Sequence, residues 1–119
     1  MRSSFLMKIF LDTADTDIIS KYFSTGLVDG VTTNPTLIMK SGKNPEDVYQ
    51  TIKDIGVRDI SMEVVGSDLE MYDEGLRLYQ KFGDVATIKV PCTREGLIVC
   101  KRLSEQGIKV NVTLIFSAA

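Results

Sequence analysis

The chain has 119 residues, a formal net charge of −2 at neutral pH, and the mixture of apolar and charged residues typical of one modest globular domain. Its lysines and arginines are scattered along the sequence, so neither nucleic acids nor membrane surfaces are expected as partners. Histidine is absent, which excludes a Ser-His-Asp triad, a Cys-His pair and any histidine-ligated metal site.

Five β-rich runs alternate with helical patterns along the chain. The runs are Lys8–Leu11, Leu27–Thr33, Ile60–Val65, Val85–Val90 and Lys109–Leu114. A glycine closes each helical stretch just before the next run, where helix C-terminal glycines belong. These glycines are Gly26, Gly56, Gly83 and Gly107. The alternation predicts βαβ units with parallel strands.

Helix starts fit the same frame, because each stretch opens on a residue whose side-chain oxygen can cap free amide groups. The capping residues are Asp15, Asn44 before Pro45, Ser67 with Glu70 three residues on, and Thr93. Two helices also show an apolar stripe that we expect to cover the sheet. The stripes are Leu69, Tyr72, Leu76 and Tyr79 in one helix and Leu97, Val99, Cys100 and Leu103 in the other.

Side-chain alternation in the strands separates a polar face from an apolar one. The polar face carries Phe10 and Asp12, Thr32 and Asn34, Ser61 and Glu63, Thr87 and Lys89, and Asn111 and Thr113. A doubly wound sheet would need two apolar faces, whereas a (β/α) barrel places polar groups at the C-terminal ends of its strands. The predicted class is therefore α/β, with residues 1–119 forming about five βα units of the N-terminal portion of a (β/α)8 TIM barrel. The barrel cannot close within this chain, because eight units take roughly 200 residues or more.

Lys89 lies inside an otherwise apolar strand. A buried lysine without a partner is costly, and its neutral amine is a nucleophile suited to Schiff-base chemistry on a carbonyl. Equally, the strand end can be exposed, so that the Lys89 side chain reaches water. This segment alone does not decide between the two.

Five motifs, each at the end of a β-rich run, carry a resemblance to a known family. They are Phe10–Asp15 (FLDTAD), Val31–Leu37 (VTTNPTL), Met62–Val64 (MEV), Ile88–Pro91 (IKVP) and Asn111–Leu114 (NVTL). In this order they resemble the transaldolases, particularly the small subfamily that includes fructose-6-phosphate aldolase. The resemblance runs from Met7 to the last residue, so residues 1–6 are interpreted as an N-terminal extension.

The resemblance implies a role for four catalytic residues. Lys89 would form a Schiff base with the ketone of a ketose phosphate, and Asp12 would move the proton of the substrate hydroxyl as the carbon–carbon bond breaks. Glu63 would hold a water that carries protons, and Thr113 would orient that water. Because Asp12 and Glu63 would favour the charged ammonium if close to it, at least one is expected to be held away by a water or hydroxyl, Thr113 being the favoured hydroxyl.

The resemblance also implies substrate-binding residues. Asn34 and Asn111 would hydrogen-bond the hydroxyls of the dihydroxyacetone unit, while Thr32 and Thr33 would shape the same wall. Each polar residue has a structural alternative: Asp12 as a helix cap, Asn34 before a proline as turn chemistry, and the others as ordinary polar strand ends. Those alternatives do not explain why the polar positions share one face with Lys89.

The function implied is that of a transaldolase of the pentose phosphate pathway. It transfers a dihydroxyacetone unit from sedoheptulose 7-phosphate or fructose 6-phosphate to an aldose phosphate, with no cofactor and no metal. Sugar phosphates are the expected partners, a homo-oligomer is expected at full length, and a cytoplasmic location is expected because no signal peptide is visible. The family's phosphate-binding serine and arginine lie in later strands, so residues 1–119 are expected to be inactive alone.

Two alternatives stay open. One is a fructose-6-phosphate aldolase, although those enzymes carry glutamine where Glu63 stands here. The other belongs to a different class: a non-catalytic half-barrel that associates with itself through its unpaired strand edges.

Overall fold

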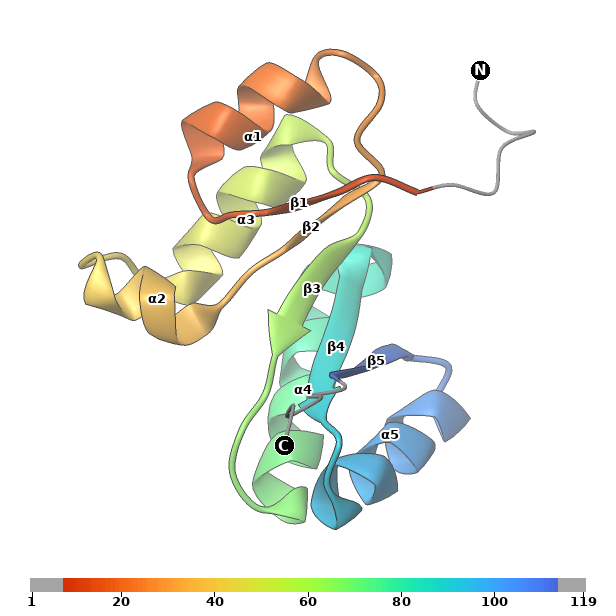
Figure 1. Cartoon of the computed structure of the whole chain (residues 1–119). Helices are drawn as coiled ribbons and strands as arrows, with labels where there is room; N and C mark the ends of the chain where they lie inside the picture. Colours follow the sequence, from red (N-terminus) through yellow and green to blue (C-terminus); the bar gives the residue numbers. More distant parts are fainter. Residues whose placement is uncertain (1–7, 114–119) are drawn as a thin grey trace, which may run out of the picture. The chain divides into compact units, whose positions relative to one another are not determined.

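A computed structural model describes residues 8–113, and the chain divides into two compact units, residues 1–60 and 61–119 (Figure 1). We refer to them as the first and second units and describe each by itself. The expected extension, residues 1–6, and the end of the fifth run, Leu114, lie outside the described residues. All five expected strands are present; the first four have bounds that differ from those predicted, and the fifth begins at Lys109 as predicted.

The first unit combines two parallel strands with three helices. Its elements are β1 (Phe10–Asp12), α1 (Thr16–Phe23), β2 (Gly30–Thr32), α2 (Pro35–Lys40) and α3 (Pro45–Ile55). In Figure 1, α1 and α3 lie side by side, and they are in contact. A small apolar core fills the space between the helices and the strands. It includes Ile19, Val31, Ile38, Val48 and Ile52, all at most 5% exposed.

The helix starts of the first unit confirm the capping predictions. The Asp15 carboxylate accepts hydrogen bonds of 3.0 and 3.2 Å from the amides of Asp17 and Ile18. Asn44 caps α3 in the same way, and Pro45 occupies its first turn. At the other end of α3, Gly56 adopts a φ of 113°, a left-handed conformation that favours glycine.

Strand β2 is shorter than predicted, since the run was expected from Leu27. The carboxylate of Asp29 accepts a 2.6 Å hydrogen bond from the Ile9 amide, so a side chain rather than a strand partner satisfies that amide. Regular pairing begins at Gly30, opposite Phe10.

Helix α2 was not predicted. It has six residues, and Ile38 is its buried one, while Leu37 and Met39 are 61% and 60% exposed. The amphipathic pattern that identifies longer helices is therefore missing. Its start is marked instead by Asn34, whose side-chain oxygen accepts from the amides of Thr36 and Leu37.

The second unit holds three strands and two long helices. Its elements are β3 (Ile60–Glu63, of which Ile60 belongs to the first unit), α4 (Asp68–Phe82), the 3-10 turn η1 (Gly83–Val85), β4 (Ala86–Pro91), α5 (Arg94–Glu105) and β5 (Lys109–Thr113). Strand β4 lies between β3 and β5, and the strands run parallel (Figure 1). The predicted caps at Ser67 and Thr93 are present, and Ser67 forms a full capping box with Glu70.

The stripe predicted to cover the sheet from α4 was wrong. Leu69 is 61% exposed, and the buried face of the helix is formed instead by Met71, Gly75, Leu78 and Phe82. Gly75 explains the difference, because a Cβ there would lie only 2.8 Å from a methyl group of Leu103. A close contact between α4 and α5 therefore falls on a glycine, which an apolar pattern does not register.

The stripe predicted for α5 is correct in part. Val99 and Leu103 are fully buried and Cys100 is half-buried, whereas Leu97 is 52% exposed. Gly96 completes the buried face. The two buried glycines thus have different neighbours: Gly75 lies against Leu103 of α5, and Gly96 lies against Pro91 at the end of β4.

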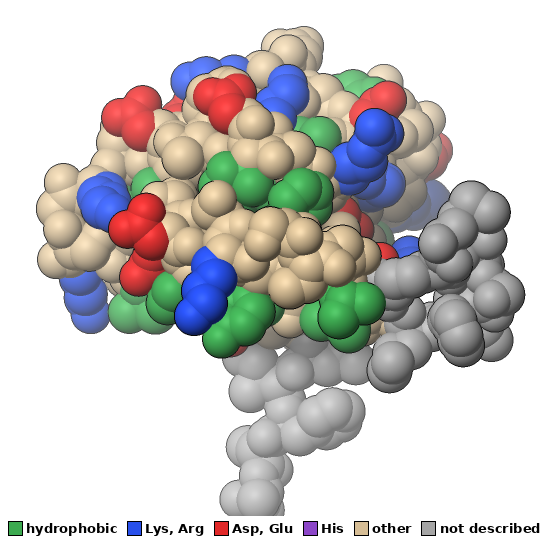
Figure 2. Space-filling view, turned by 90° about the horizontal axis from the view of Figure 1, so that it is seen from above, with side chains coloured by type: hydrophobic (Ala, Val, Ile, Leu, Met, Phe, Trp, Pro, Cys, Tyr) green, Lys and Arg blue, Asp and Glu red, His purple; other side chains and the backbone are tan. Residues whose placement is uncertain are grey.

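Surface charge is mixed. On the face shown in Figure 2, acidic and basic side chains are interspersed, and neither sign forms a continuous patch.

Over residues 8–113, no helix has the length and apolar character needed to cross a membrane.

Candidate functional site

The strands of the second unit have one apolar and one polar face, as predicted. Ile88 and Val90 of β4 are fully buried, whereas the neighbouring Lys89 is half-buried on the opposite face. On β3 and β4 the exposure of the polar face increases along the strand, whereas on β5 Lys109 and Asn111 are exposed and Thr113 is half-buried. Ser61 and Thr87 are buried at 2% and 8%, and Lys89, which follows Thr87 on this face, is more accessible. The polar face of β3 and β4 therefore opens towards the C-terminal ends of these strands.

Hydrogen bonds fix the register between β3 and β4. The amide of Val64 donates a 3.0 Å bond to the carbonyl of Lys89. In the parallel pair β1–β2, the Gly30 amide donates to the Ile9 carbonyl, and Gly30 is paired with the next residue, Phe10. The same relation pairs Val64 with Val90, and so places Glu63 directly opposite Lys89.

On its other side, Lys89 is paired with Asn111 of β5. Paired residues of a parallel sheet direct their side chains to the same face, about 4.8 Å apart along the hydrogen-bonding direction. Glu63, Lys89 and Asn111 therefore form one row across three strands. Within residues 61–113, Lys89 and Glu63 form no ion pair, so the carboxylate and the amine are neighbours without direct contact.

Thr113 lies two residues beyond Asn111, nearer the C-terminal end of β5 than this row. It is paired with Pro91, and its carbonyl accepts a 3.1 Å bond from the Cys92 amide. Within the described residues it makes no hydrogen bond to Glu63, from which β4 separates it. That Thr113 orients a water near Glu63 stays a prediction.

The end of β4 is held by the start of α5. Thr93 caps the helix by accepting a 3.0 Å bond from the Gly96 amide. A Cβ at Gly96 would overlap the carbonyl oxygen of Pro91, so only glycine permits this approach. The backbone two residues beyond Lys89 is thereby fixed against the helix.

The first unit places Asp12 and Thr32 opposite one another at the ends of β1 and β2. The Thr32 hydroxyl donates a 3.0 Å hydrogen bond to the Asp12 carboxylate. Below them, the ring of Phe10 covers Gly30, where a Cβ would lie 2.5 Å from a ring carbon. Asp12 is thus an exposed carboxylate oriented by a neighbouring hydroxyl, and it does not cap α1, because Asp15 does.

The other two predicted residues of the first unit have different surroundings. Thr33 is 3% exposed, and unlike Thr32 it is buried. Asn34 is exposed, and its side-chain oxygen is used to cap α2. Its NH2 group remains the part that can donate to a ligand.

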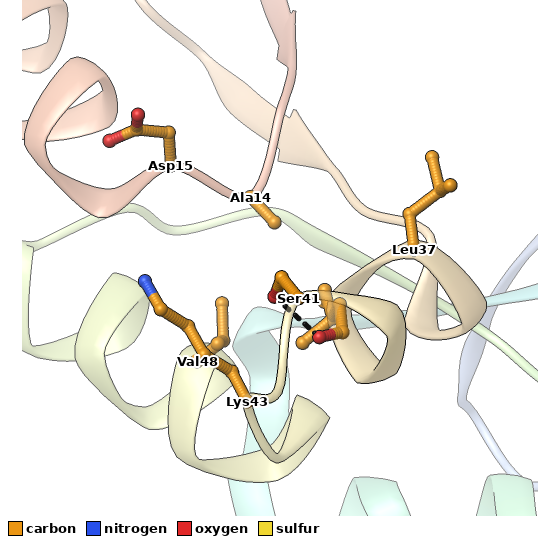
Figure 3. A pocket seen from close by; sticks show the side chains of 7 residues that line it. Ala14, Asp15, Leu37, Ser41, Lys43 and Val48 are labelled. Carbon is orange, nitrogen blue, oxygen red and sulfur yellow. Dashed lines mark hydrogen bonds between the residues drawn. The ribbon is translucent and has the colours of Figure 1, made fainter.

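A pocket of about 250 Å³ lies in the first unit between the β1–α1 connection, α2 and the start of α3 (Figure 3). Its lining is mostly apolar, with Leu37 and Val48 on two sides. The Ser41 hydroxyl at its edge donates a 2.6 Å bond to the Ile38 carbonyl. None of the predicted site residues lines this pocket, so it does not identify a reaction centre.

One charged residue on the polar face was not predicted. Lys109 belongs to the same face of β5 as Asn111 and Thr113, and it is paired with Thr87. The alternation that identified Asn111 and Thr113 would have found it, had the run been followed back to its first residue.

The arrangement suits covalent chemistry on a carbonyl group. A lysine amine is an effective nucleophile when neutral, and a neighbouring carboxylate can act in proton transfer. The amide of Asn111 beside them can donate to and accept from a hydroxyl-rich ligand. An amine, a carboxylate and an amide are thus supplied by three adjacent strands.

Comparison with known proteins gives one family. The sequence model described as Transaldolase/Fructose-6-phosphate aldolase matches residues 9–119.

Individual relatives agree. A probable transaldolase of Nitrosopumilus maritimus is 53% identical over 112 residues, which cover 93% of this chain and 50% of the relative. A probable transaldolase of Anaeromyxobacter dehalogenans is 52% identical, covering 93% of this chain and 51% of the relative. One from Paracoccus denitrificans is 52% identical, covering 95% and 52%. The chain thus spans about half the length of the relatives it matches.

Proposed function

The chain belongs to the transaldolase/fructose-6-phosphate aldolase family, and on that premise we propose that it supplies the nucleophile of a transaldolase that works through a Schiff base on Lys89. The observation that carries this proposal is the row formed by Glu63, Lys89 and Asn111. An amine placed between a carboxylate and an amide matches the needs of imine formation on a hydroxyketone.

In the proposed reaction, the neutral Lys89 amine attacks the ketone carbon of a ketose phosphate and forms a carbinolamine. Glu63, acting through a water oriented by Thr113, transfers the protons needed to expel water and leave an iminium. The electron-poor iminium carbon then accepts the electron pair released when the adjacent carbon–carbon bond breaks. Asp12 takes the proton of the cleaved hydroxyl, and the aldose phosphate departs.

The dihydroxyacetone unit stays bound to Lys89 as an enamine. Its nucleophilic carbon attacks the aldehyde of the acceptor, and Asp12 returns a proton to the new hydroxyl. Hydrolysis of the resulting iminium regenerates the amine. Asn34 and Asn111 hold the hydroxyls of the retained unit during the exchange, with Thr32 and Thr33 forming part of the surrounding wall.

The proposal also names the substrates, the pathway and the cellular location. The donor is sedoheptulose 7-phosphate or fructose 6-phosphate, the acceptor is an aldose phosphate, and the reaction belongs to the pentose phosphate pathway in the cytoplasm. The whole protein functions as a homo-oligomer and needs no cofactor. Because the chain spans half of its relatives, the groups that hold the phosphate are assigned to the other half.

A chimera tests the proposal. Residues 8–113 would replace the matching part of the Nitrosopumilus maritimus relative, which is 53% identical to this chain. With fructose 6-phosphate and borohydride, the chimera should gain the mass of a reduced dihydroxyacetone adduct on the peptide that contains Lys89. Lys89→Met should abolish it, and Lys101→Met, which removes an exposed lysine of α5, should not.

A folded chimera without an adduct on Lys89 would contradict the proposal.

Where the adduct forms, analysis of the products distinguishes the two activities that the family description names. Release of glyceraldehyde 3-phosphate that requires erythrose 4-phosphate as acceptor supports a transaldolase, whereas release of free dihydroxyacetone without an acceptor supports an aldolase.

A further inference from the structure

Building on the proposed Schiff base, we propose that Val65 covers the dihydroxyacetone unit bound to Lys89 and keeps water from it. The unit is then transferred to an acceptor aldehyde and is not released. Val65 follows the end of β3, and its side chain is 69% exposed. The proposed reaction gives this large apolar side chain no other task.

Val65 is the next residue after Glu63 on the polar face. Successive residues of an extended strand point to opposite faces, and burial shows this alternation, because Val64 is 1% exposed and Val65 is 69% exposed. The amide of Val64 donates its 3.0 Å hydrogen bond to the carbonyl of Lys89 itself, so pairing with β4 continues beyond the assigned end of β3. Since Glu63 lies opposite Lys89, Val65 comes opposite Pro91.

Val65, Pro91 and Thr113 thus form a second row, nearer the strand ends than Lys89. Pro91 and Thr113 are a registered pair of β4 and β5. Val65 is one strand away from Lys89 and two residues further along, so the two Cα atoms are about 8 Å apart on the diagonal. The flexible four-carbon stem of Lys89 allows a group bound to its amine to contact the Val65 methyl groups.

The backbone on both sides of Val65 is fixed. Before it stands the hydrogen-bonded Val64, and after it stands Gly66, with a φ of 115°. A Cβ at Gly66 would lie 3.2 Å from side-chain atoms of Glu70, so the connection packs closely against the first turn of α4. The Ser67 amide, which donates to the Glu70 carboxylate over 3.1 Å, closes this turn. Val65 is therefore presented by an ordered connection.

An apolar side chain is unusual on this face. Within residues 61–113, the strand residues that share the face are polar apart from Pro91. They are Ser61, Glu63, Thr87, Lys89, Lys109, Asn111 and Thr113. An apolar edge beside a nucleophile excludes water from a reactive intermediate, which prevents its hydrolysis.

The enamine on Lys89 has two possible fates. In transfer, its nucleophilic carbon attacks the acceptor aldehyde. In release, water protonates that carbon, and the hydroxide left behind adds to the iminium carbon and forms a carbinolamine. The carbinolamine hydroxyl proton then moves to the nitrogen as the carbon–nitrogen bond breaks, which frees dihydroxyacetone and restores the amine. One water is consumed in release and none in transfer, so the exclusion of water favours transfer.

The ratio of the two products tests the role of Val65. The chimera is given fructose 6-phosphate and erythrose 4-phosphate, and chromatography measures free dihydroxyacetone against sedoheptulose 7-phosphate. Val65→Thr keeps the shape of the side chain and adds a hydroxyl that can hold water. It should raise the ratio of release to transfer about fivefold, the effect expected when a hydroxyl replaces a methyl group in an apolar contact.

This ratio compares two fates of one intermediate, so it does not depend on the fraction of enzyme that is folded. Val65→Ile keeps the apolar cover and should leave the ratio within about twofold. Leu97→Thr is the matched control, because Leu97 is an apolar residue of α5 that is 52% exposed and lies outside the polar face. It should leave the ratio unchanged.

Equal ratios for the unchanged chimera and the folded Val65→Thr variant would overturn the inference. So would an unchanged chimera that releases dihydroxyacetone faster than it transfers it. If Val65→Thr fails to fold, as judged by circular dichroism, Val65→Ala removes the covering methyl groups and carries the same expectation.

Failure of this inference differs from failure of the proposed function. A borohydride adduct on Lys89 together with an unchanged ratio rejects the role of Val65 alone. A folded chimera with no adduct rejects both, because the enamine that Val65 would cover does not form.

Discussion

The hydroxyl of Thr32 donates a 3.0 Å hydrogen bond to the carboxylate of Asp12 across the ends of two paired strands. A carboxylate held by one neighbour presents its remaining lone pairs in a defined direction, which proton transfer requires. Thr32, first interpreted as part of the substrate-binding wall, therefore also orients the proposed acid–base group.

Thr32→Val tests this orientation, since valine keeps the shape and β-preference of threonine but cannot donate. In the chimera, cleavage of fructose 6-phosphate should slow about fivefold, corresponding to about 1 kcal/mol for the lost hydrogen bond. Single-turnover release of glyceraldehyde 3-phosphate measures this step. Formation of the Lys89 adduct should keep its rate, because Asp12 acts after the imine has formed.

Thr32→Ser supplies the control. It retains the hydroxyl and should retain most of the cleavage rate. If the serine and valine variants slowed cleavage equally, the shape of the threonine would matter and the hydrogen bond would not.

The capping box of α4 predicts a dependence of stability on pH. The backbone amide of Ser67 donates a 3.1 Å bond to the Glu70 carboxylate, and this bond, followed by the contact with the Ser67 side chain, lowers the pKa of Glu70 from its ordinary value of 4.5. A lowered folded-state pKa stabilises the protein above the unfolded value, and this contribution is lost as pH falls through the folded value.

Glu70→Gln should therefore lower stability relative to the unchanged chain at pH 7, and the difference should shrink as pH falls below about 4.5. Urea denaturation at several pH values measures the change, and an NMR titration reports the Glu70 carboxylate directly. Asp73→Asn, an exposed position on the same helix, serves as the control. A difference independent of pH would mean that the charge of Glu70 contributes nothing.

Alternation and capping predicted most of the architecture. The strand runs, the helix starts at Asp15 and Ser67 and the polar face around Lys89 follow from short-range chemistry that a single sequence displays. What escaped prediction depends on contacts distant in sequence. The amide of Ile9 is taken by Asp29, twenty residues away, which delays the start of β2.

The residues of the candidate site were predicted from the sequence, but which of them lie side by side was not. The row of Glu63, Lys89 and Asn111 depends on strand register, which the alternation of side chains leaves open by steps of two residues. Asn34 shows the opposite case. Its motif suggested both a turn and a ligand contact, and the structure shows its oxygen capping α2, a helix too short to carry a periodic signal.

Gly96 gives a prediction about the support of β4. Glycine-to-alanine changes within helices usually stabilise by about 1 kcal/mol. Here a Cβ would overlap the Pro91 carbonyl oxygen, so Gly96→Ala should instead lower the free energy of unfolding by about 2 kcal/mol. Thermal and urea denaturation measure the change. Ser104→Ala, on an exposed position of the same helix, should change stability by less than about 0.5 kcal/mol.

The corrected packing of α4 can be tested by comparing two residues that lie two positions apart. Met71 is 1% exposed and Leu69 is 61% exposed, although the apolar pattern favoured Leu69 as the buried one. Tyr72, of the same stripe, is half-buried and lies with its ring 4.1 Å from the Arg102 guanidinium, a contact that sequence spacing does not reveal.

Met71→Ala should therefore lower the free energy of unfolding by about 3 kcal/mol, because it removes buried apolar atoms and leaves a cavity between α4 and its neighbours. Leu69→Ala removes a side chain of similar size from a largely exposed position, so it should cost less than about 0.5 kcal/mol. Urea denaturation of both variants gives the comparison directly. Equal losses, or a larger loss for Leu69→Ala, would mean that the helix packs through the stripe favoured by its sequence.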